Sequence, residues 1–339
     1  MGYNIAVVGA TGKVGAEIIN IMASWPFPID KLYAVASSKS IGKQVSFTDD
    51  KLIDVQVLDD FDFKGIDIAF FTAGSDVSEK YAPIAAKAGA LIIDNTTCFR
   101  MLQDVPLVVP EVNSSTISLF KKKNIIANPN CVVIPLAVAL SPIHDAVGIK
   151  KVVVSTYQSV SGAGKEAMEE LYDQTRDIYT YQKKDPKIFQ KQIAFNLIPQ
   201  IDNIESTGFT GEELKIMTEF GKIVDNNIEI VATSVRVPVF LGHSMSVHIE
   251  CEEDTTVSNI KNILTNSAGI VVSDLLESSN YTTPIEVAGK DEVYVSRIRK
   301  SPYNNKEFQL WVVADNIRKG AALNAAQIAE IYLKKFYKK

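Results

Sequence analysis

The sequence lacks the features that mark several large classes of protein. It has only three cysteines, Cys98, Cys131 and Cys251, and they show no CxxC spacing. An odd number of dispersed cysteines argues against a disulfide framework or a zinc cage and favours reduced thiols. The longest apolar run, residues 131–143, contains two prolines and falls short of the roughly 20 residues that span a membrane. No charged segment precedes the first apolar run, so we expect no secretory signal and a cytoplasmic location.

An excess of basic charge is also absent, since the formal net charge is -5. Because binding to the phosphates of nucleic acid requires a basic face, we expect neither nucleic acid nor a membrane as a partner. The 46% of hydrophobic and 22% of charged residues are enough for a sizeable core and exclude wholesale disorder. A length of 339 residues favours two domains.

The first part of the chain alternates short apolar runs with helical patterns. We expect strands at 5–9, 32–37, 66–74 and 90–95, helices at 13–24 and 78–89, and further strands of the same sheet at 106–112 and 125–129. This alternation is typical of a parallel sheet with helices on its faces. A new helical pattern opens near Cys131, and we place the first domain boundary there.

Beyond residue 150 the strands become longer and alternate between apolar and polar residues. We expect strands at 150–160, 228–240, 244–252 and 292–300, and helices at 163–182, 211–224, 256–267 and 318–336. A mixed or antiparallel sheet with separate helices follows from this order. The second part therefore reads as an α+β domain.

A glycine-rich turn follows the first expected strand and opens the first expected helix. Its sequence, Gly9-Ala-Thr-Gly12-Lys-Val-Gly15, is a GxxGxxG variant of the dinucleotide fingerprint. Glycines at such a turn let the backbone approach a pyrophosphate, which the N-terminus of the helix stabilises. A tight turn without a ligand is the alternative reading.

The end of the second expected strand indicates which dinucleotide binds. A NAD site usually has an acidic residue there to hold the ribose 2′-hydroxyl, whereas this chain has Ser37-Ser38-Lys39-Ser40. A cation among hydroxyl groups suits a 2′-phosphate. The sequence therefore predicts NADP over NAD, with an ordinary polar loop as the alternative.

Cys131 stands where an apolar helix is expected to begin. The amides and the dipole of a helix N-terminus favour a thiolate, and the same amides can stabilise an oxyanion. By itself such a cysteine is more often a packing residue. Beside a nucleotide site it suits a thiol that forms a hemithioacetal with an aldehyde, which predicts aldehyde oxidation or its reversal.

Arg236 and His243 are seven residues apart in one segment and can converge. Arginine binds a carboxylate with two parallel hydrogen bonds, and histidine exchanges protons near neutral pH. This spacing therefore suggests a carboxylate clamp beside an acid/base group. An exposed strand end is the alternative.

Nine motifs, in order, carry a resemblance to a known family. They are GATGKVG (9–15), DNTTCFR (94–100), VPLVVPEVN (105–113), ANPNC (127–131), STYQSVSGAGK (155–165), IAFNLIPQID (193–202), EELK (212–215), RVPVFLGHS (236–244) and WVVADNIRKGAALNAAQIAE (311–330). The chain resembles the aspartate-semialdehyde dehydrogenases over nearly its whole length. The resemblance implies an α/β protein with a Rossmann-like NADP-binding domain, 1–130 plus 317–339, and a second α+β catalytic and dimerisation domain, 131–316.

The resemblance also implies a reaction and its partners. The reaction is the reversible, phosphate-dependent oxidation of L-aspartate 4-semialdehyde to L-4-aspartyl phosphate with NADP, which serves lysine, threonine and methionine biosynthesis. The implied partners are a small-molecule substrate and inorganic phosphate. The implied assembly is a homodimer or homotetramer.

Residue roles follow from matching the motifs position by position. The implied catalytic residues are Cys131 as the nucleophile that forms an acyl thioester, His243 as the acid/base and Gln158 as the residue that orients the intermediate. The residues implied for substrate and phosphate are Arg100, Asn130, Glu212, Lys215 and Arg236. The residues implied or predicted for the cofactor are Gly9, Thr11, Gly12, Lys13, Val14, Ser37, Lys39, Ser40, Ser161, Gly162 and Asn316.

The chain departs from the family pattern at two places, and rival functions remain open. Val132 and Val133 follow Cys131 where the family commonly has Ser or Thr, and Lys39 stands where relatives often have arginine. The rivals are N-acetyl-gamma-glutamyl-phosphate reductase, a glyceraldehyde-phosphate type of dehydrogenase, and a non-catalytic relative with a nucleotide pocket. The Tyr-Pro-Thr and Ser-Cys-Thr-Thr-Asn motifs of the two rival enzymes are absent, and the retained Cys131 argues against the third.

Overall fold

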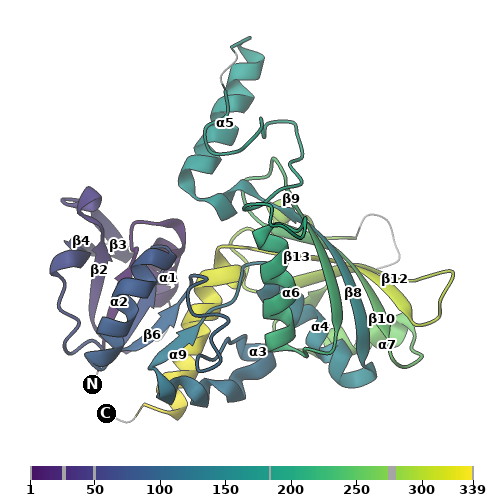
Figure 1. Ribbon diagram of the computed structural model, residues 1–339, viewed down its shortest axis with the longest axis horizontal. Helices are drawn as coiled ribbons and strands as arrows, with labels where there is room; N and C mark the ends of the chain where they lie inside the picture. The colour runs from purple at the N-terminus through teal and green to yellow at the C-terminus, as the bar shows by residue number, and fades with distance from the viewer. Residues whose placement is uncertain (1, 25–27, 49–50, 183–184, 274–279, 338–339) are drawn as a thin grey trace. The chain divides into compact units, whose positions relative to one another are not determined.

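The chain forms two compact units in a computed structural model that describes residues 2–24, 28–48, 51–182, 185–273 and 280–337. The first unit contains residues 1–130 together with 321–339, and the second contains residues 131–320. Both units combine helices with a sheet (Figure 1). Within the described residues, no helix is long and apolar enough to cross a membrane.

The first unit contains a seven-stranded sheet in the order β3-β4-β2-β1-β5-β6-β7. Its strands are β1 (Tyr3–Val8), β2 (Ile29–Ala36), β3 (Gln44–Thr48), β4 (Lys51–Val57), β5 (Ile68–Phe71), β6 (Leu91–Asp94) and β7 (Ile125–Ala127). All neighbours pair in parallel except β3, which runs antiparallel to β4. The central strands β1, β5 and β6 are almost wholly buried, as expected for a parallel sheet that is covered on both faces.

The helices of the first unit pack onto this sheet. They are α1 (Lys13–Ser24), α2 (Ser75–Lys87), α3 (Pro110–Asn113) and α9 (Leu323–Lys335), with 3-10 segments η1 (Ser38–Ser40), η2 (Leu58–Asp60) and η3 (Ser114–Lys122). Helices α1 and α9 share an apolar core with β1 and β5, while α2 packs on β5 and β6. The C-terminal helix is thus part of the first unit, although some two hundred residues of sequence separate it from the rest.

The second unit contains a six-stranded mixed sheet in the order β11-β12-β13-β10-β8-β9. Its strands are β8 (Ile149–Gln158), β9 (Glu229–Arg236), β10 (His243–Cys251), β11 (Ile270–Val272), β12 (Val293–Lys300) and β13 (Glu307–Ala314). β8 runs parallel to β9 and antiparallel to β10. Residues along β8 and β10 alternate between buried and partly exposed, so one face of the sheet is covered and the other is open.

Helices cover one face of this second sheet. They are α4 (Val133–Val147), α5 (Lys165–Tyr179), α6 (Gly211–Ile223), α7 (Val257–Thr265) and α8 (Pro284–Val287), with the 3-10 turn η4 (Val160–Ala163). Helix α4 is apolar and buried from Val133 to Leu140 and packs against α6, α7 and the sheet. Helix α5 instead extends away from the sheet and contacts η4 (Figure 1). The predicted α/β class, with a parallel first sheet and an α+β second part, is confirmed.

One expected strand is wrong, and the strands β3, β4, β11 and β13 were not expected. The run 106–112 is not a strand: it forms only an isolated bridge, Leu107 to Ala127, before α3 begins at Pro110. Pro106 and Pro110 lack the N–H groups that a strand ladder needs. The pair β3 and β4 was not expected, although its alternation of exposed and half-buried residues is the pattern of a strand with one covered face.

Candidate active site

The first unit carries the predicted dinucleotide turn, residues 9–15, between β1 and α1. Gly9 has φ +91°, and a Cβ there would lie 2.5 Å from the hydroxyl oxygen of Thr72. A Cβ on Gly15 would lie 2.3 Å from the carbonyl oxygen of Gly9, so only glycine lets α1 begin this close to β1. Glycines at both positions form the tight, close-packed backbone that a pyrophosphate site requires, so the turn fits a dinucleotide.

The other predicted residues of the turn are placed where a ligand can reach them. Thr11, Gly12 and Lys13 are exposed, and Val14 is half-buried. Lys13 is the first residue of α1, so the amides of the first helical turn have no partner inside the helix. An anion at this end is stabilised by those amides and by the helix dipole.

The segment after β2 lies against the same turn. Ser38–Ser40 forms a 3-10 turn, with Ser37 and Lys39 exposed and Ser40 buried. The hydroxyl oxygens of Ser40 and Thr11 lie 3.3 Å apart, which ties this segment to the dinucleotide turn. The structure therefore brings the predicted 2′-phosphate residues together with the predicted pyrophosphate residues.

Arg100 and Asn130 also belong to the first unit and are both buried. Arg100 donates from Nε to the carbonyl oxygen of Asn128 and from Nη2 to that of Asn95, each at 2.9 Å. The loop that holds Arg100 is anchored by the buried Asp94, whose carboxylate accepts hydrogen bonds from two neighbouring hydroxyl groups, and burial raises the pKa of that carboxyl. These bonds fix the guanidinium against the backbone, while Asn130 directly precedes Cys131 in the chain.

The second unit brings four distant segments to one edge of its sheet. In the strand register Gln158 lies beside Arg236, Tyr157 beside Ser244, and His243 beside Ala314. The C-terminal ends of β8, β9 and β13 and the N-terminal end of β10 therefore share one edge. We call the group Gln158, Arg236, His243 and Asn316 at this position the catalytic edge.

Gln158 joins this edge to the start of helix α6. Its Nε2 donates to Glu212 Oε1 at 3.1 Å, and its Oε1 accepts from Thr156 at 2.9 Å. Lys215, one turn further along α6, lies 3.6 Å from Glu212 Oε2 and also contacts Asp202. The predicted residues Gln158, Glu212 and Lys215 therefore form one connected chain of contacts, in which both Gln158 and Glu212 are buried.

Arg236 is buried at the end of β9 and donates from Nη1 to the carbonyl oxygen of Ser159 at 2.8 Å. Burial lowers the pKa of its guanidinium, and the negative charges of Glu212 and of a Cys131 thiolate oppose this effect. The guanidinium and Cys131 therefore lie within electrostatic range of each other. An arginine in this position attracts both a thiolate and the carboxylate of a ligand.

His243 is fully buried at the start of β10. Burial, and then the charge of Arg236, lower the pKa of His243 to about 3, so the imidazole is neutral near pH 7. Its Nδ1 lies 3.0 Å from the backbone nitrogen of Ser159 and 3.1 Å from the hydroxyl oxygen of the same residue, while Nε2 has no hydrogen-bond partner among the described residues. One ring nitrogen is thus held by the protein and the other is left for chemistry.

Ser161, Gly162 and Asn316 complete the edge. The amide of Asn316 donates to Ser161 Oγ at 3.0 Å, and its oxygen accepts from the backbone N–H of Gly242 at 3.0 Å. A Cβ on Gly162 would lie 3.0 Å from Arg236 Nη1 and 3.2 Å from His243 Nε2. Glycine at this position therefore keeps the space in front of both groups free of a side chain.

Cys131 is half-buried, forms no disulfide, and stands two residues before α4 begins at Val133. Gly320 approaches it closely, since a Cβ on Gly320 would lie 3.3 Å from Cys131 Cβ. The expected position of Cys131 at a helix start is thus accurate to within two residues. Val132 and Val133, the departures from the family pattern, are both fully buried and contribute to the core.

Two buried residues at the site were not predicted. Ser159 contacts His243 through both its amide and its hydroxyl, and nothing in the sequence pattern singles it out. Glu213 accepts from the backbone N–H groups of Thr210 at 2.7 Å and Ser234 at 2.9 Å, and so ties α6 to β9. The Thr-x-x-Glu pattern of residues 210–213 is a capping box, a signal that would have found Glu213.

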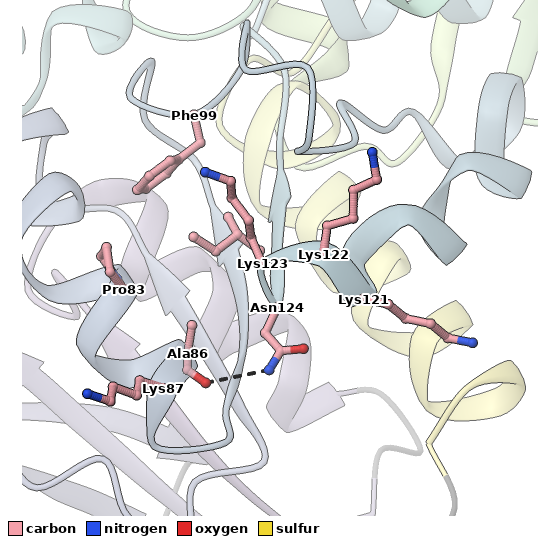
Figure 2. Close-up of a pocket in the computed structure, with 9 residues that line it drawn as sticks. Pro83, Ala86, Lys87, Phe99, Lys121, Lys122, Lys123 and Asn124 are labelled. Carbon is pink, nitrogen blue, oxygen red and sulfur yellow. Dashed lines mark hydrogen bonds between the residues drawn. The ribbon is translucent and has the colours of Figure 1, made fainter.

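A hollow of about 360 Å³ in the first unit involves none of the predicted site residues. It is lined by Pro83, Ala86, Lys87, Phe99, Lys121, Lys122, Lys123, Asn124 and Ile125. Figure 2 shows that the four lysine side chains point in different directions rather than toward one centre. Lys122 moreover pairs with Asp104 at 2.7 Å. The hollow therefore lacks the convergent charges of an anion site.

Comparisons with known proteins show which family the chain is similar to. Residues 4–120 match the family model "Semialdehyde dehydrogenase, NAD binding domain", and residues 140–319 match "Semialdehyde dehydrogenase, dimerisation domain". Aspartate-semialdehyde dehydrogenases of Rickettsia bellii and Rickettsia conorii are 52% identical over 98% and 97% of both chains, respectively. A crystal structure of aspartate semialdehyde dehydrogenase II from Vibrio cholerae, complexed with ASA, superposes with a TM-score of 0.96 at 44% identity and covers 99% of this chain and 100% of its own.

Proposed function

The chain belongs to the aspartate-semialdehyde dehydrogenase family, and from that premise we propose how its own residues carry out the reaction. The reaction interconverts L-aspartate 4-semialdehyde and L-4-aspartyl phosphate through an acyl thioester on Cys131. One observation carries the residue assignment: Gln158, Arg236 and His243 are buried together at one sheet edge, and the Arg236 guanidinium lies within electrostatic range of Cys131.

Arg236 is the group that orients the substrate. A guanidinium binds a carboxylate with two parallel hydrogen bonds, and burial strengthens that attraction. Its Nη1 is fixed by the carbonyl oxygen of Ser159, so the direction of the remaining donors is set before substrate binds. A small aldehyde with a carboxylate is held so that its carbonyl carbon faces Cys131.

Cys131 and His243 then perform the covalent steps. The thiolate attacks the aldehyde carbon and forms a C–S bond, while the carbonyl oxygen takes up the proton that Cys131 released on ionisation and becomes a hemithioacetal hydroxyl group. His243 Nε2 accepts the proton of that hydroxyl, and Gln158 orients the oxygen by hydrogen bonding. NADP, when bound, would supply the acceptor for the hydride on the same carbon. Attack of phosphate on the resulting thioester forms the acyl phosphate, breaks the C–S bond and restores the thiolate.

The cofactor is NADP, held by the dinucleotide turn and by the segment that follows β2. Lys39 is exposed next to Ser37 and Ser40, and no carboxylate stands among residues 37–40. This combination favours a 2′-phosphate over a 2′-hydroxyl, because a lysine attracts the added charge and nothing nearby repels it. Gly9, Thr11, Gly12, Lys13 and Val14 supply the pyrophosphate turn, and Ser161, Gly162 and Asn316 form the nicotinamide side of the site.

Inorganic phosphate is bound by cations whose positions are fixed. Arg100 is held by two backbone carbonyl groups, and Lys215 is held by Glu212 and Asp202. Fixed positive groups suit a divalent anion because little side-chain freedom is lost when it binds. Asn130 supports the turn that carries the nucleophile.

The open face of the second sheet is the surface through which two copies associate. Val153 and Val231 lie side by side on this face and are 40% and 43% exposed. Tyr157 and Trp311 pack together on the same face, with ring centroids 5.6 Å apart. Apolar and aromatic side chains that are grouped on one face in this way are typical of a homodimer interface. A homotetramer adds further contacts to this interface.

The two functional domains are 1–130 with 317–339, which binds NADP, and 131–316, which holds the catalytic edge and the dimer surface. The compact units of the structure support this division. A cytoplasmic location suits an enzyme whose nucleophile is a cysteine outside any disulfide, because a reducing compartment keeps the thiol reduced.

The test is NADPH formation from NADP and L-aspartate 4-semialdehyde, measured with and without phosphate. We expect turnover that depends on phosphate and that is lost in Cys131→Ala. Absence of turnover while NADP still binds would contradict the proposal. It would favour N-acetyl-gamma-glutamyl-phosphate reductase activity or a non-catalytic role. Turnover of the acetylated substrate in the same assay would indicate the reductase, and no turnover would indicate the non-catalytic role.

A further inference from the structure

Ser159 follows directly after β8 and is fully buried beside His243. Its backbone nitrogen lies 3.0 Å from His243 Nδ1, and its hydroxyl oxygen lies 3.1 Å from the same atom. One residue therefore presents both a donor and a hydroxyl group to the ring nitrogen that faces away from Gly162. Both contacts join positions 84 residues apart in the sequence.

The two contacts favour different forms of the imidazole. A backbone amide can only donate, so its bond to Nδ1 requires the ring proton to sit on Nε2. A hydroxyl oxygen can accept, so its contact with Nδ1 is satisfied when that nitrogen carries the proton. Ser159 thus provides a partner for the neutral ring with its proton on either nitrogen, and for the imidazolium, in which both nitrogens are protonated.

Neighbouring groups decide how the hydroxyl of Ser159 is oriented. It donates to Asn316 Oδ1 at 3.2 Å, an oxygen that also accepts from the N–H of Gly242. The N–H of Gly242 requires an oxygen as its acceptor, which fixes which end of the Asn316 amide faces Ser159, and the hydroxyl oxygen of Ser161 lies 2.9 Å from that of Ser159. With its proton directed at Asn316, the oxygen of Ser159 keeps lone pairs for an N–H at Nδ1.

Base chemistry at Nε2 needs such an acceptor. To take the hemithioacetal proton, Nε2 must offer a lone pair, so the ring proton must be on Nδ1. After the transfer the ring is an imidazolium, whose Nδ1–H is buried and has no water to bind. Burial and the charge of Arg236 disfavour this cation, which makes an oxygen at Nδ1 more important than it would be at the surface.

We propose that Ser159 is a positioning residue whose hydroxyl selects the proton-accepting form of His243. The inference rests on the proposed function, because it concerns the base of that reaction. During the step the proton moves from the hemithioacetal oxygen to Nε2. The proton on Nδ1 remains on the ring, bonded to the oxygen of Ser159, and Ser159 itself neither gains nor loses a proton.

The kinetic test is Ser159→Ala in the oxidative direction. We expect kcat to fall about 10- to 100-fold, because the backbone N–H that remains holds the ring in the form with its proton on Nε2. The KM values for the aldehyde and NADP should stay within about twofold, since neither ligand loses a binding group. Ser159→Thr, which keeps a hydroxyl, should recover most of the rate.

Ser296→Ala is the matched control, because Ser296 is also fully buried in the same sheet and its hydroxyl has no hydrogen-bond partner among the described residues. It should keep the kcat of the unchanged protein. Alkylation of Cys131 should proceed at the same rate in Ser159→Ala, which shows that the nucleophile is unaffected. A wild-type kcat in Ser159→Ala, or an equal loss in Ser296→Ala, would overturn the inference.

A spectroscopic test separates the inference from the proposed function. The nitrogen resonances of ¹⁵N-labelled histidine report which ring nitrogen carries the proton, and those of His243 are identified by their loss in His243→Asn. Ser159→Ala should shift the free enzyme toward the form protonated on Nε2. Unchanged resonances refute the inference even if kcat falls. If the unchanged protein fails to turn over the aldehyde, the proposed function is wrong, and the resonances still decide the role of Ser159.

Discussion

The dinucleotide turn of the first unit consists of consecutive residues, and its outer members Thr11, Gly12 and Lys13 are exposed. The catalytic edge of the second unit instead takes Gln158, Arg236 and His243 from three strands, and all three are buried. The turn presents backbone groups whose close packing depends on its glycines. The edge works through side chains that hold one another. A substitution should therefore affect one region without the other.

The largest effect is expected at the nucleophile. Cys131→Ser should lower turnover by at least about 1,000-fold, because a serine hydroxyl has no comparable anionic form at neutral pH and no adjacent strong base. The affinity for NADP, measured by equilibrium titration, should be unchanged, since the dinucleotide turn is intact. A variant that keeps more than a few per cent of the activity would show that Cys131 is not the nucleophile.

The reverse experiment damages the turn. A Cβ in Gly15→Ala would lie 2.3 Å from the carbonyl oxygen of Gly9, so α1 must move away from β1. We expect the Kd for NADP to rise about 10- to 100-fold and the first unit to lose about 1–3 kcal/mol of stability. The alkylation rate of Cys131 serves as the internal control and should not change. Equal losses in NADP binding and thiol reactivity would show that the two regions are not independent.

Lys39→Glu tests the specificity for NADP over NAD in the segment that follows β2. A carboxylate near the 2′-phosphate repels it, so the Kd for NADP should rise about tenfold, while that for NAD should change less than twofold. Lys43→Glu is the matched control, because Lys43 is exposed on the loop that follows the Ser38–Ser40 turn. A similar loss of NADP affinity in both variants would mean that only overall charge matters. The difference should shrink at high salt.

The comparison also explains what the sequence could predict. The glycines at 9, 12 and 15 predict the turn, because the geometry of a tight turn depends on residues that are neighbours in the sequence. The sequence also placed Cys131 within two residues of a helix start. Nine of the strands that the structure describes were found from their apolar runs, whereas β3, β4, β11 and β13 were not expected. By contrast, Ser159 contacts His243, 84 residues away, and no short pattern records that contact; the capping box identifies Glu213 but not its bond to Ser234, 21 residues away. The run 106–112 was mistaken for a strand because its apolar residues are buried without pairing along a strand.

The last expected effect is a pH dependence of stability that belongs to the catalytic edge alone. The pKa of His243 is about 3 in the folded protein and near 6.5 when unfolded. Between these values the unfolded chain binds a proton that the folded protein does not, so stability falls as the pH falls. From pH 7 to pH 5 this histidine should remove about 2 kcal/mol from the free energy of unfolding.

His243→Asn lacks the titrating group, so the difference between its free energy of unfolding and that of the unchanged protein isolates the contribution of His243. Denaturant titrations of both proteins at pH 7 and pH 5 measure it. The pH-dependent loss should be smaller in His243→Asn by that same amount of about 2 kcal/mol. Parallel losses in the two proteins would mean that His243 titrates near its ordinary pKa. The imidazole would then be charged in weak acid, and the buried, neutral base on which the catalytic edge depends would have to be abandoned.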